Sequence, residues 1–312
     1  MSFQKPVAIL NPSAAGGRAK KKWAALTPLL AESLGDVEAL FTERPSHATE
    51  LTTNALRSGA DLVIAIGGDG TINEVVNGFF EAGNSINPNA ALAVIPIGTG
   101  SDFQRTARLP TDLHEAVSLI ASGSRKPIDV ARLRLAGHDG RPIERYFANL
   151  TSFGMGGDVS IKAKNNWLTN VSGKAAFLWA TFSVFLKYSG KTVRLTLDGK
   201  RLDDDFVITN VAIGNGEYHG GGMHPCPRAR LDSGSLEVTV IERLTTFELI
   251  IDIGVLYSDD VYKHPKAHHF QAKHIVAESD ETVRAEVDGE TLGKLPLEAE
   301  IVPAAIELIQ TR

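Results

Sequence analysis

Apolar residues follow two different spacings in the first third of the chain. Short apolar runs, rich in β-branched residues, predict buried strands over residues 6–10, 37–41, 62–66 and 90–96. Between these runs, helical spacing predicts helices over 22–34, 47–56 and 71–80, and Asp112 is expected to begin another helix. Strands that alternate with helices favour an α/β domain in which helices wrap a parallel sheet.

The pattern changes near residue 125. Beyond it, alternating apolar and polar residues predict strands over 130–135, 145–150, 192–200, 206–214, 234–242, 268–277 and 283–287. Short strands at regular spacing favour a β-rich antiparallel sandwich, here interrupted by a helical insert over residues 172–188. We therefore expect two domains, residues 1–126 and 127–312, with the last ~15 residues packing back on the first domain.

Composition and charge exclude several classes of protein. The 312 residues are 43% hydrophobic and 22% charged, and the net charge of −5 argues against nucleic acid as a partner. The single cysteine, Cys226, leaves no internal disulfide and favours a reducing compartment. Residues 1–6 hold no signal core, and the longest nearly apolar run, 175–186, is shorter than the ~20 residues that a membrane-spanning helix needs. We expect a cytoplasmic protein whose contact with a membrane, where it occurs, is peripheral and at the inner face.

The segment at residues 67–74, Gly-Gly-Asp-Gly-Thr-Ile-Asn-Glu, directly follows the predicted strand at 62–66. Its glycines let the backbone approach a ligand closely, and Thr71 to Glu74 match a capping box that opens a helix. A strand, a glycine turn and a helix N-terminus form an anion site, because free N–H groups and the positive end of the helix dipole face the ligand. Since Asp69 would repel phosphates unless a cation lay between them, the segment predicts a nucleotide bound with Mg²⁺.

Further motifs occur along the chain in a recognisable order. Residues 11–13 (Asn-Pro-Ser) follow the first predicted strand and 96–103 (Pro-Ile-Gly-Thr-Gly-Ser-Asp-Phe) follow the fourth, while 215–223 and 288–290 (Asp-Gly-Glu) lie in the β-rich part. Together with the glycine turn, they make essentially the whole chain similar to the diacylglycerol kinase catalytic-domain family, in its bacterial soluble lipid kinase branch. The glycine turn alone is shared with NAD kinases and, more loosely, with phosphofructokinases.

The resemblance implies an ATP-dependent lipid kinase with ATP and Mg²⁺ as cofactors. The γ-phosphoryl group would pass to a hydroxyl of a lipid such as diacylglycerol, with the nucleotide between the α/β nucleotide-binding domain and the β-rich substrate domain. Asp69 matches the essential acid of the family. The residues that match its nucleotide contacts are Asn11, Pro12, Ser13, Thr42, Gly67, Gly68, Asp69, Gly70, Thr71, Ile72, Asn73 and Thr99.

Asp288 and Glu290 match the catalytic Asp-Gly-Glu element of the family. Phosphoryl transfer to an alcohol needs a base near the attacking hydroxyl. Two carboxylates at positions i and i+2 of an extended segment would point the same way. Gly289 between them permits a bend, however, and by themselves the three residues are more typical of a hairpin turn. We favour Glu290 as the base and Asp288 as a partner that orients it or holds Mg²⁺, and the assignment between the two stays open.

One motif departs from the family. Residues 231–234 read Leu-Asp-Ser-Gly where members often have Leu-Asp-Asp-Gly, whose second Asp helps to hold a structural Mg²⁺ in some of them. Serine is a poor ligand for a hard cation. A structural Mg²⁺ here would need Asp232 together with the backbone carbonyls of Arg230 and Ser235.

Three questions stay open at this level. Asp102 either caps the helix that begins at Phe103 or lies near substrate. The motifs also leave room for a soluble-substrate kinase of the NAD-kinase type and for a non-catalytic nucleotide or lipid sensor. The partner we expect is a lipid substrate at a membrane surface, and a homodimer is left open because free sheet edges often pair.

Overall fold

The computed structural model describes residues 3–98, 100–164, 183–185, 188–248 and 254–311. It contains two compact units, one made of Met1–Asp129 with Pro303–Arg312 and the other of Val130–Val302. Two strands, β7 (Ser124–Gly137) and β17 (Glu290–Gln310), contribute residues to both units. The boundary expected between residues 126 and 127 therefore falls within β7.

The first unit is built on a sheet whose neighbouring strands run parallel. Its order is β2–β1–β3–β6, and the end of β17 continues it through the pairs Glu307–Ala91 and Leu308–Leu92. The strands are β1 (Pro6–Leu10), β2 (Glu38–Phe41), β3 (Leu62–Gly67) and β6 (Ala91–Pro96), and a small hairpin joins β4 (Phe80–Glu81) to β5 (Asn84–Ser85). Continuous apolar runs form β1 and β3 because both faces of the sheet are covered.

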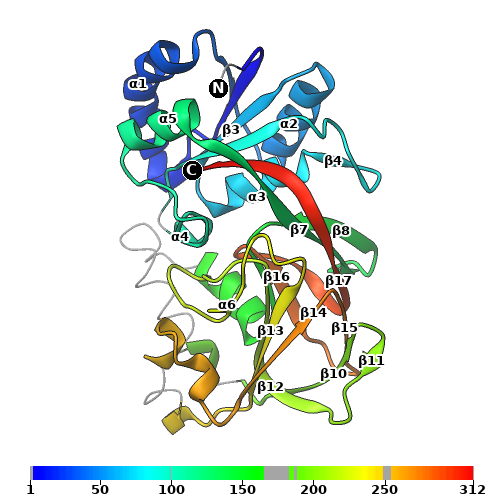
Figure 1. Cartoon of the computed structure of the whole chain (residues 1–312). Helices are drawn as coiled ribbons and strands as arrows, with labels where there is room; N and C mark the ends of the chain where they lie inside the picture. Colours follow the sequence, from blue (N-terminus) through cyan, green and yellow to red (C-terminus); the bar gives the residue numbers. More distant parts are fainter. Residues whose placement is uncertain (1–2, 99, 165–182, 186–187, 249–253, 312) are drawn as a thin grey trace. The chain divides into compact units, whose positions relative to one another are not determined.

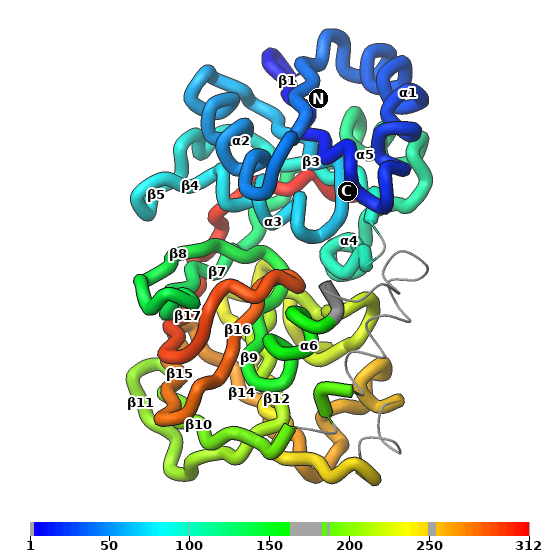
Figure 2. Tube along the Cα trace, turned by 180° about the vertical axis from the view of Figure 1, so that it is seen from behind, coloured from blue at the N-terminus to red at the C-terminus, as the bar shows by residue number. Residues whose placement is uncertain are grey.

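Helices cover this sheet in two groups. α1 (Ala14–Leu34) lies beside α5 (Leu113–Ser122), and α2 (His47–Arg57) lies beside α3 (Asp69–Asn77), as both views of the molecule show (Figures 1 and 2). A short helix, α4 (Asp102–Thr106), follows β6. The first pair packs on a core of buried residues that includes Leu10, Leu30, Ile64, Ile95 and Val117.

The predicted helix ends agree with the structure at some positions and fail at others. Gly35 ends α1 as expected, with φ 80°, and Asp112 caps α5 by accepting the N–H groups of His114 and Glu115. The predicted capping box at Thr71 is wrong, because α3 already begins at Asp69.

The carboxylate of Glu74 makes different contacts from those of a capping box. It accepts the N–H groups of Ser46 (2.8 Å) and Ala48 (3.0 Å), and so satisfies free donors at the start of α2. Glu74 therefore links α3, to which it belongs, to the start of α2, and it does not cap the N-terminus of α3.

The second unit is antiparallel throughout its described pairings, which confirms the prediction of a β-rich part. The pairing path runs β10–β12–β9–β16–β17, β15 joins β10 to β17, β13 and β14 extend from β12, and β8 pairs with β7. These strands are β8 (Pro142–Phe147), β9 (Leu150–Gly154), β10 (Lys191–Leu197), β11 (Lys200–Arg201), β12 (Phe206–Gly214), β13 (Leu236–Glu242), β14 (Ala267–Ala272), β15 (His274–Glu278) and β16 (Arg284–Val287).

One predicted strand and one predicted helix need comment. The strand expected over 268–277 is two strands, because β14 pairs with β13 whereas β15 pairs with β10 and β17. Most of the helical insert expected over 172–188 lies outside the described residues. The helices of this unit that the structure describes include α6 (Met155–Lys164), η2 (Val255–Tyr257) and η3 (Val261–Lys263). Among the described residues, no helix combines the length and the apolar character that crossing a bilayer requires.

Candidate active site

Two glycine turns meet at the carboxyl ends of β3 and β6. A Cβ on Gly98 would lie 2.8 Å from the Cα of Gly68, and a Cβ on Gly67 would lie 2.5 Å from Oγ1 of Thr71. The N–H of Ile97 donates to the carbonyl of Gly67 at 2.7 Å and holds the two turns together. Glycine is required at 67 and 98 because only a residue without a side chain permits this approach.

Asp69 is the first residue of α3, directly after the turn. Its Oδ1 accepts the N–H of Phe103 at 3.0 Å. Burial raises the pKa of the Asp69 carboxyl, and the charge of Asp102 raises it further.

The carboxylate of Asp102 lies near that of Asp69. A Cβ on Gly100 would lie 2.8 Å from Oδ2 of Asp69 and 3.6 Å from Oδ2 of Asp102, so both carboxylates flank the same glycine. Asp102 is only 6% exposed, and Arg105 lies 3.7 Å from its Oδ1. Two neighbouring carboxylates, at the first residues of α3 and α4, suit a hard divalent cation, whose charge would relieve their repulsion.

The loop after β1 is tied to the same place. The N–H of Asn11 donates to the carbonyl of Ile66, and its Nδ2 donates to Oγ1 of Thr71 at 3.3 Å. Oδ1 of Asn11 accepts the N–H of Ser13 at 3.0 Å, and the N–H of Thr42 donates to the carbonyl of Leu10. The structure thus gathers the ends of β1, β2 and β3, where parallel sheets bind their ligands.

The remaining predicted nucleotide residues of the first unit differ in their surroundings. Pro12 is half-buried, and a Cβ on Gly70 would meet no atom within 4 Å. Ile72 is 3% exposed and its side chain belongs to the core, and the Asn73 side chain accepts a hydrogen bond from Asn77. Thr99 lies outside the described residues.

Asp288 and Gly289 form the two-residue turn between β16 and β17, with φ 46° and 84°. The expectation that Asp288 and Glu290 point the same way from an extended segment is therefore wrong, because the chain reverses between them. Asp288 is half-buried and accepts the N–H of Leu150 at 3.2 Å, whereas Glu290 is exposed. Both acids belong to the second unit and Asp69 to the first.

Sequence reasoning missed a buried acid next to this turn. Glu286 on β16 has no exposed surface, and its oxygens accept the N–H of Gly289 (2.7 Å) and the hydroxyl of Ser152 (2.6 Å). Nε2 of His219 lies 3.2 Å from Oε1 of Glu286. The one local signal was a charged residue between the apolar Ala285 and Val287, which is equally typical of an exposed strand position.

The loop proposed for a structural Mg²⁺ is organised around a hydroxyl. Oγ of Ser233 lies 3.2 Å from the carbonyl oxygen of Arg230 and 2.8 Å from that of Ser235, the two carbonyls expected as metal ligands. The carboxylate of Asp232 pairs with the guanidinium of Arg230. Among the described residues, no group of three His, Cys, Asp or Glu side chains is placed to hold a metal ion.

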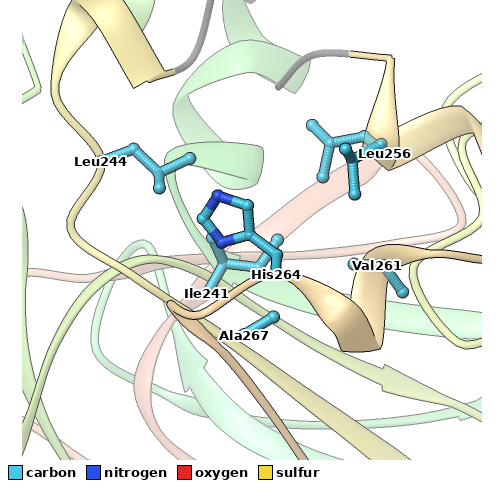
Figure 3. A pocket seen from close by; sticks show the side chains of 7 residues that line it. Ile241, Leu244, Leu256, Val261, His264 and Ala267 are labelled. Atoms are coloured by element: carbon cyan, nitrogen blue, oxygen red, sulfur yellow. The ribbon is translucent and has the colours of Figure 1, made fainter. Parts of the chain in front are cut away.

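The second unit also contains an apolar pocket (Figure 3). About 310 Å³ of space lies among its lining residues when the open solvent at its mouth is included, so the pocket is a shallow one. Leu256, one of its lining residues, accepts the backbone N–H of His224 at 2.7 Å. The pocket is lined by Ile241, Leu244, Val255, Leu256, Val261, His264 and Ala267.

Two family models match the chain. The model described as the diacylglycerol kinase catalytic domain matches residues 5–133, and the one described as the YegS C-terminal NAD kinase beta sandwich-like domain matches residues 151–310. A diacylglycerol kinase from Staphylococcus saprophyticus is 30% identical over 261 residues, which cover 84% of this chain and 80% of the relative.

Solved structures resemble the chain over nearly its full length. A crystal structure of a diacylglycerol kinase from Bacillus anthracis strain Sterne is 27% identical with a TM-score of 0.72, covering 99% of this chain and 98% of that one. Yeast NADH kinase complexed with NADH is 14% identical with a TM-score of 0.55, covering 99% of this chain and 83% of that one. At that identity the likeness to NADH kinase shows the fold alone.

Proposed function

The chain belongs to the diacylglycerol kinase family and is an ATP-dependent lipid kinase, and we propose that its first unit binds the nucleotide through the turn after β3. The open space beside Gly70 and the free N–H groups at the start of α3 support phosphate binding there. The loop that contains Asn11 lies against this turn through Thr71 and adds further polar groups.

Asp69 and Asp102 are the residues that we propose hold Mg²⁺ with the nucleotide. Burial and, after it, the charge of Asp102 raise the pKa of Asp69, and a cation between the two carboxylates would offset both by favouring the ionised form. When bound, Mg²⁺ would neutralise charge that develops on the phosphate oxygens. Asp69 would take this role in its ionised form, so binding of Mg²⁺ with the nucleotide is expected to lower the pKa of Asp69.

The second unit supplies the base in this proposal. Glu290 is exposed at the first position of β17, whereas Asp288 is half-buried and its carboxylate accepts the N–H of Leu150. We therefore assign proton abstraction to Glu290 and a supporting role to Asp288. The hydroxyl oxygen then attacks the γ-phosphorus as ADP leaves.

The test is phosphate transfer from ATP to lipids in mixed micelles, with a total lipid extract as acceptor and mass spectrometry as readout. Glu290→Ala should lower kcat by ~10²- to 10⁴-fold, the usual worth of a general base, and Asp69→Ala should lower it at least as far. Asp36→Asn, at an exposed acid of the first unit, is the matched control and should keep wild-type activity. Undiminished transfer by Asp69→Ala would overturn the phosphate-site assignment.

We propose that part of an acyl chain of the acceptor lies against the apolar pocket of Figure 3. Its lining residues are apolar apart from His264, and it is tied to the glycine-rich segment through His224. Ala267→Leu would occupy part of the space, so KM for long-chain diacylglycerol should rise ~10-fold while a short-chain, water-soluble diacylglycerol is used as before. An equal effect on both acceptors would contradict the assignment.

Contact with a membrane surface is part of the same proposal. Phe247 is 73% exposed and shares a segment with Leu244 of the pocket. Phe247→Ser should weaken binding to diacylglycerol-containing vesicles, whereas Phe41→Ser, at an exposed phenylalanine of the first unit, should not.

The alternative of a kinase for a soluble substrate such as NAD has weaker support, because the likeness to NADH kinase is one of fold. A direct assay with NAD as acceptor decides between the two.

A further inference from the structure

The Asp288-Gly289 turn is hydrogen-bonded to the carboxylate of Glu286, which is neither of the two proposed catalytic acids. Glu286 is fully buried, and its Oε2 accepts the N–H of Gly289 at 2.7 Å. Because that N–H belongs to the peptide group between Asp288 and Gly289, the hydrogen bond fixes the orientation of this peptide within the turn. The carbonyl of Glu286 in turn accepts the hydroxyl of Thr151 on β9 at 2.7 Å.

The second oxygen of Glu286 connects the turn to two other parts of the unit. Oε1 accepts the hydroxyl of Ser152 on β9 at 2.6 Å and lies 3.2 Å from Nε2 of His219. A buried carboxylate is tolerated only when donors surround it, and here the turn, a strand and a loop each provide one. The carboxylate of Glu286 therefore connects the turn, strand β9 and the loop of His219 to one another.

His219 stands at the base of a glycine tip. Its N–H and carbonyl pair with those of Met223, both at 2.9 Å, and Gly220, Gly221 and Gly222 between them have φ values of 62°, 83° and 115°. Only glycine adopts such a series readily, so the tip has little rigidity of its own. The side-chain contact between His219 and Glu286 links this tip to the Asp288-Gly289 turn.

We propose that Glu286, together with His219, is a positioning residue for phosphoryl transfer. It holds the turn that carries Asp288 and Glu290 in one orientation, and it joins that turn to the glycine tip at 220–222. This inference rests on the proposed function, in which the acids of the turn act on the acceptor hydroxyl.

Glu286→Gln tests the role directly. An amide has one acceptor oxygen and one NH₂ donor, so it must set a donor against either the N–H of Gly289 or the donors of Ser152 and His219. We expect kcat to fall by ~10- to 100-fold, as for loss of a supporting hydrogen bond, while KM for MgATP stays unchanged because the nucleotide turn belongs to the first unit.

Glu237→Gln is the matched control. Glu237 on β13 is likewise buried, at 2% exposed, and its carboxylate accepts hydrogen bonds from Tyr262 and Gln271, away from the turn. A structural role alone would make the two Gln variants alike. Hydrogen exchange over residues 284–294 should speed up in Glu286→Gln only.

His219 offers a second pair of variants, should Glu286→Gln fail to fold. His219→Gln keeps an N–H donor that reaches Glu286 and should retain most of kcat, whereas His219→Leu removes the donor and should lose activity as Glu286→Gln does. Equal activity of the two His219 variants would overturn the role of that side chain.

The outcomes separate this inference from the proposed function. If Glu290→Ala is inactive while Glu286→Gln matches Glu237→Gln in kcat, the positioning role is wrong and the proposed function stands. If Glu290→Ala keeps wild-type kcat, the assignment of the base fails, and the positioning role fails with it.

Discussion

Two acids in the two units illustrate how differently a protein can hold a carboxylate. Glu286 in the second unit is completely buried, yet its two oxygens meet donors from Gly289, Ser152 and His219. Asp69 in the first unit keeps some exposure and accepts backbone N–H groups, among them that of Phe103, but it also lies near a second carboxylate, Asp102. Burial by itself therefore does not decide the energetic cost of a charge.

The difference matches the roles that we assign to the two residues. A carboxylate whose donors are complete contributes to a rigid structure. The pKa of Asp69 is raised by burial and further by the charge of Asp102, so its ionised form gains when a cation arrives and offsets the repulsion. We infer that repulsion between carboxylates occurs at the proposed nucleotide site, whereas hydrogen-bond donors surround the carboxylate of Glu286.

The largest expected effect is the loss of stability on removing Glu286. Glu286→Ala leaves several buried donors without their acceptor, so the free energy of unfolding should fall by about 3 to 5 kcal/mol. Urea unfolding measures this change. The control is Glu290→Ala, at an exposed acid four residues further on, which should stay within about 0.5 kcal/mol of wild type. A small effect of Glu286→Ala would show that water replaces the lost acceptor.

Substitution of Asp69 is expected to raise the free energy of unfolding, whereas substitution of Glu286 lowers it. Asp69→Asn removes a charge that burial and Asp102 disfavour, so the nucleotide-free protein should become more stable at pH 7 by on the order of 1 kcal/mol. Urea unfolding again measures the change, with Asp36→Asn as the control.

The gain at Asp69 should depend on pH in a defined direction. A carboxyl whose folded pKa is raised binds its proton more tightly in the folded state, so its cost is absent below the unfolded pKa of ~3.9 and complete above the folded one. The stabilisation by Asp69→Asn should therefore grow as the pH rises through that window. A gain that shrinks with rising pH would contradict the pKa direction.

The smallest effect is expected at Gly70. Its Cβ would meet no atom within 4 Å, so Gly70→Ala should stabilise α3 by about 0.5 to 1 kcal/mol, as alanine does in a helix. If the open space belongs to the nucleotide, the same variant should bind ATP more weakly, as calorimetry would show. Unchanged ATP binding would place the phosphates elsewhere.

Some features of these acidic sites could be predicted from nearby residues in the sequence, whereas others depend on residues far away in the chain. The turn after β3 could be read from residues 67–74, because a glycine turn after a buried strand is a local pattern. The sequence did not show that Asp102 lies beside Asp69, because a residue that only caps the following helix would look the same. The family motifs pointed to Asp288 and Glu290, but the same residues allow an extended segment or a hairpin turn, and the structure has the hairpin.

Residue periodicity and short motifs were enough for the strands of the first unit, the antiparallel character of the second and the membership of a lipid kinase family. Such features depend on neighbouring residues, whose spacing along the chain reflects which face is buried. The surroundings of each acid depend instead on packing between distant segments: 34 residues separate Asp69 from its donor Phe103, and 134 separate Glu286 from Ser152. Contacts of this kind form only when the strands and turns pack together. They determine which carboxylate lies near a like charge and which is surrounded by hydrogen-bond donors.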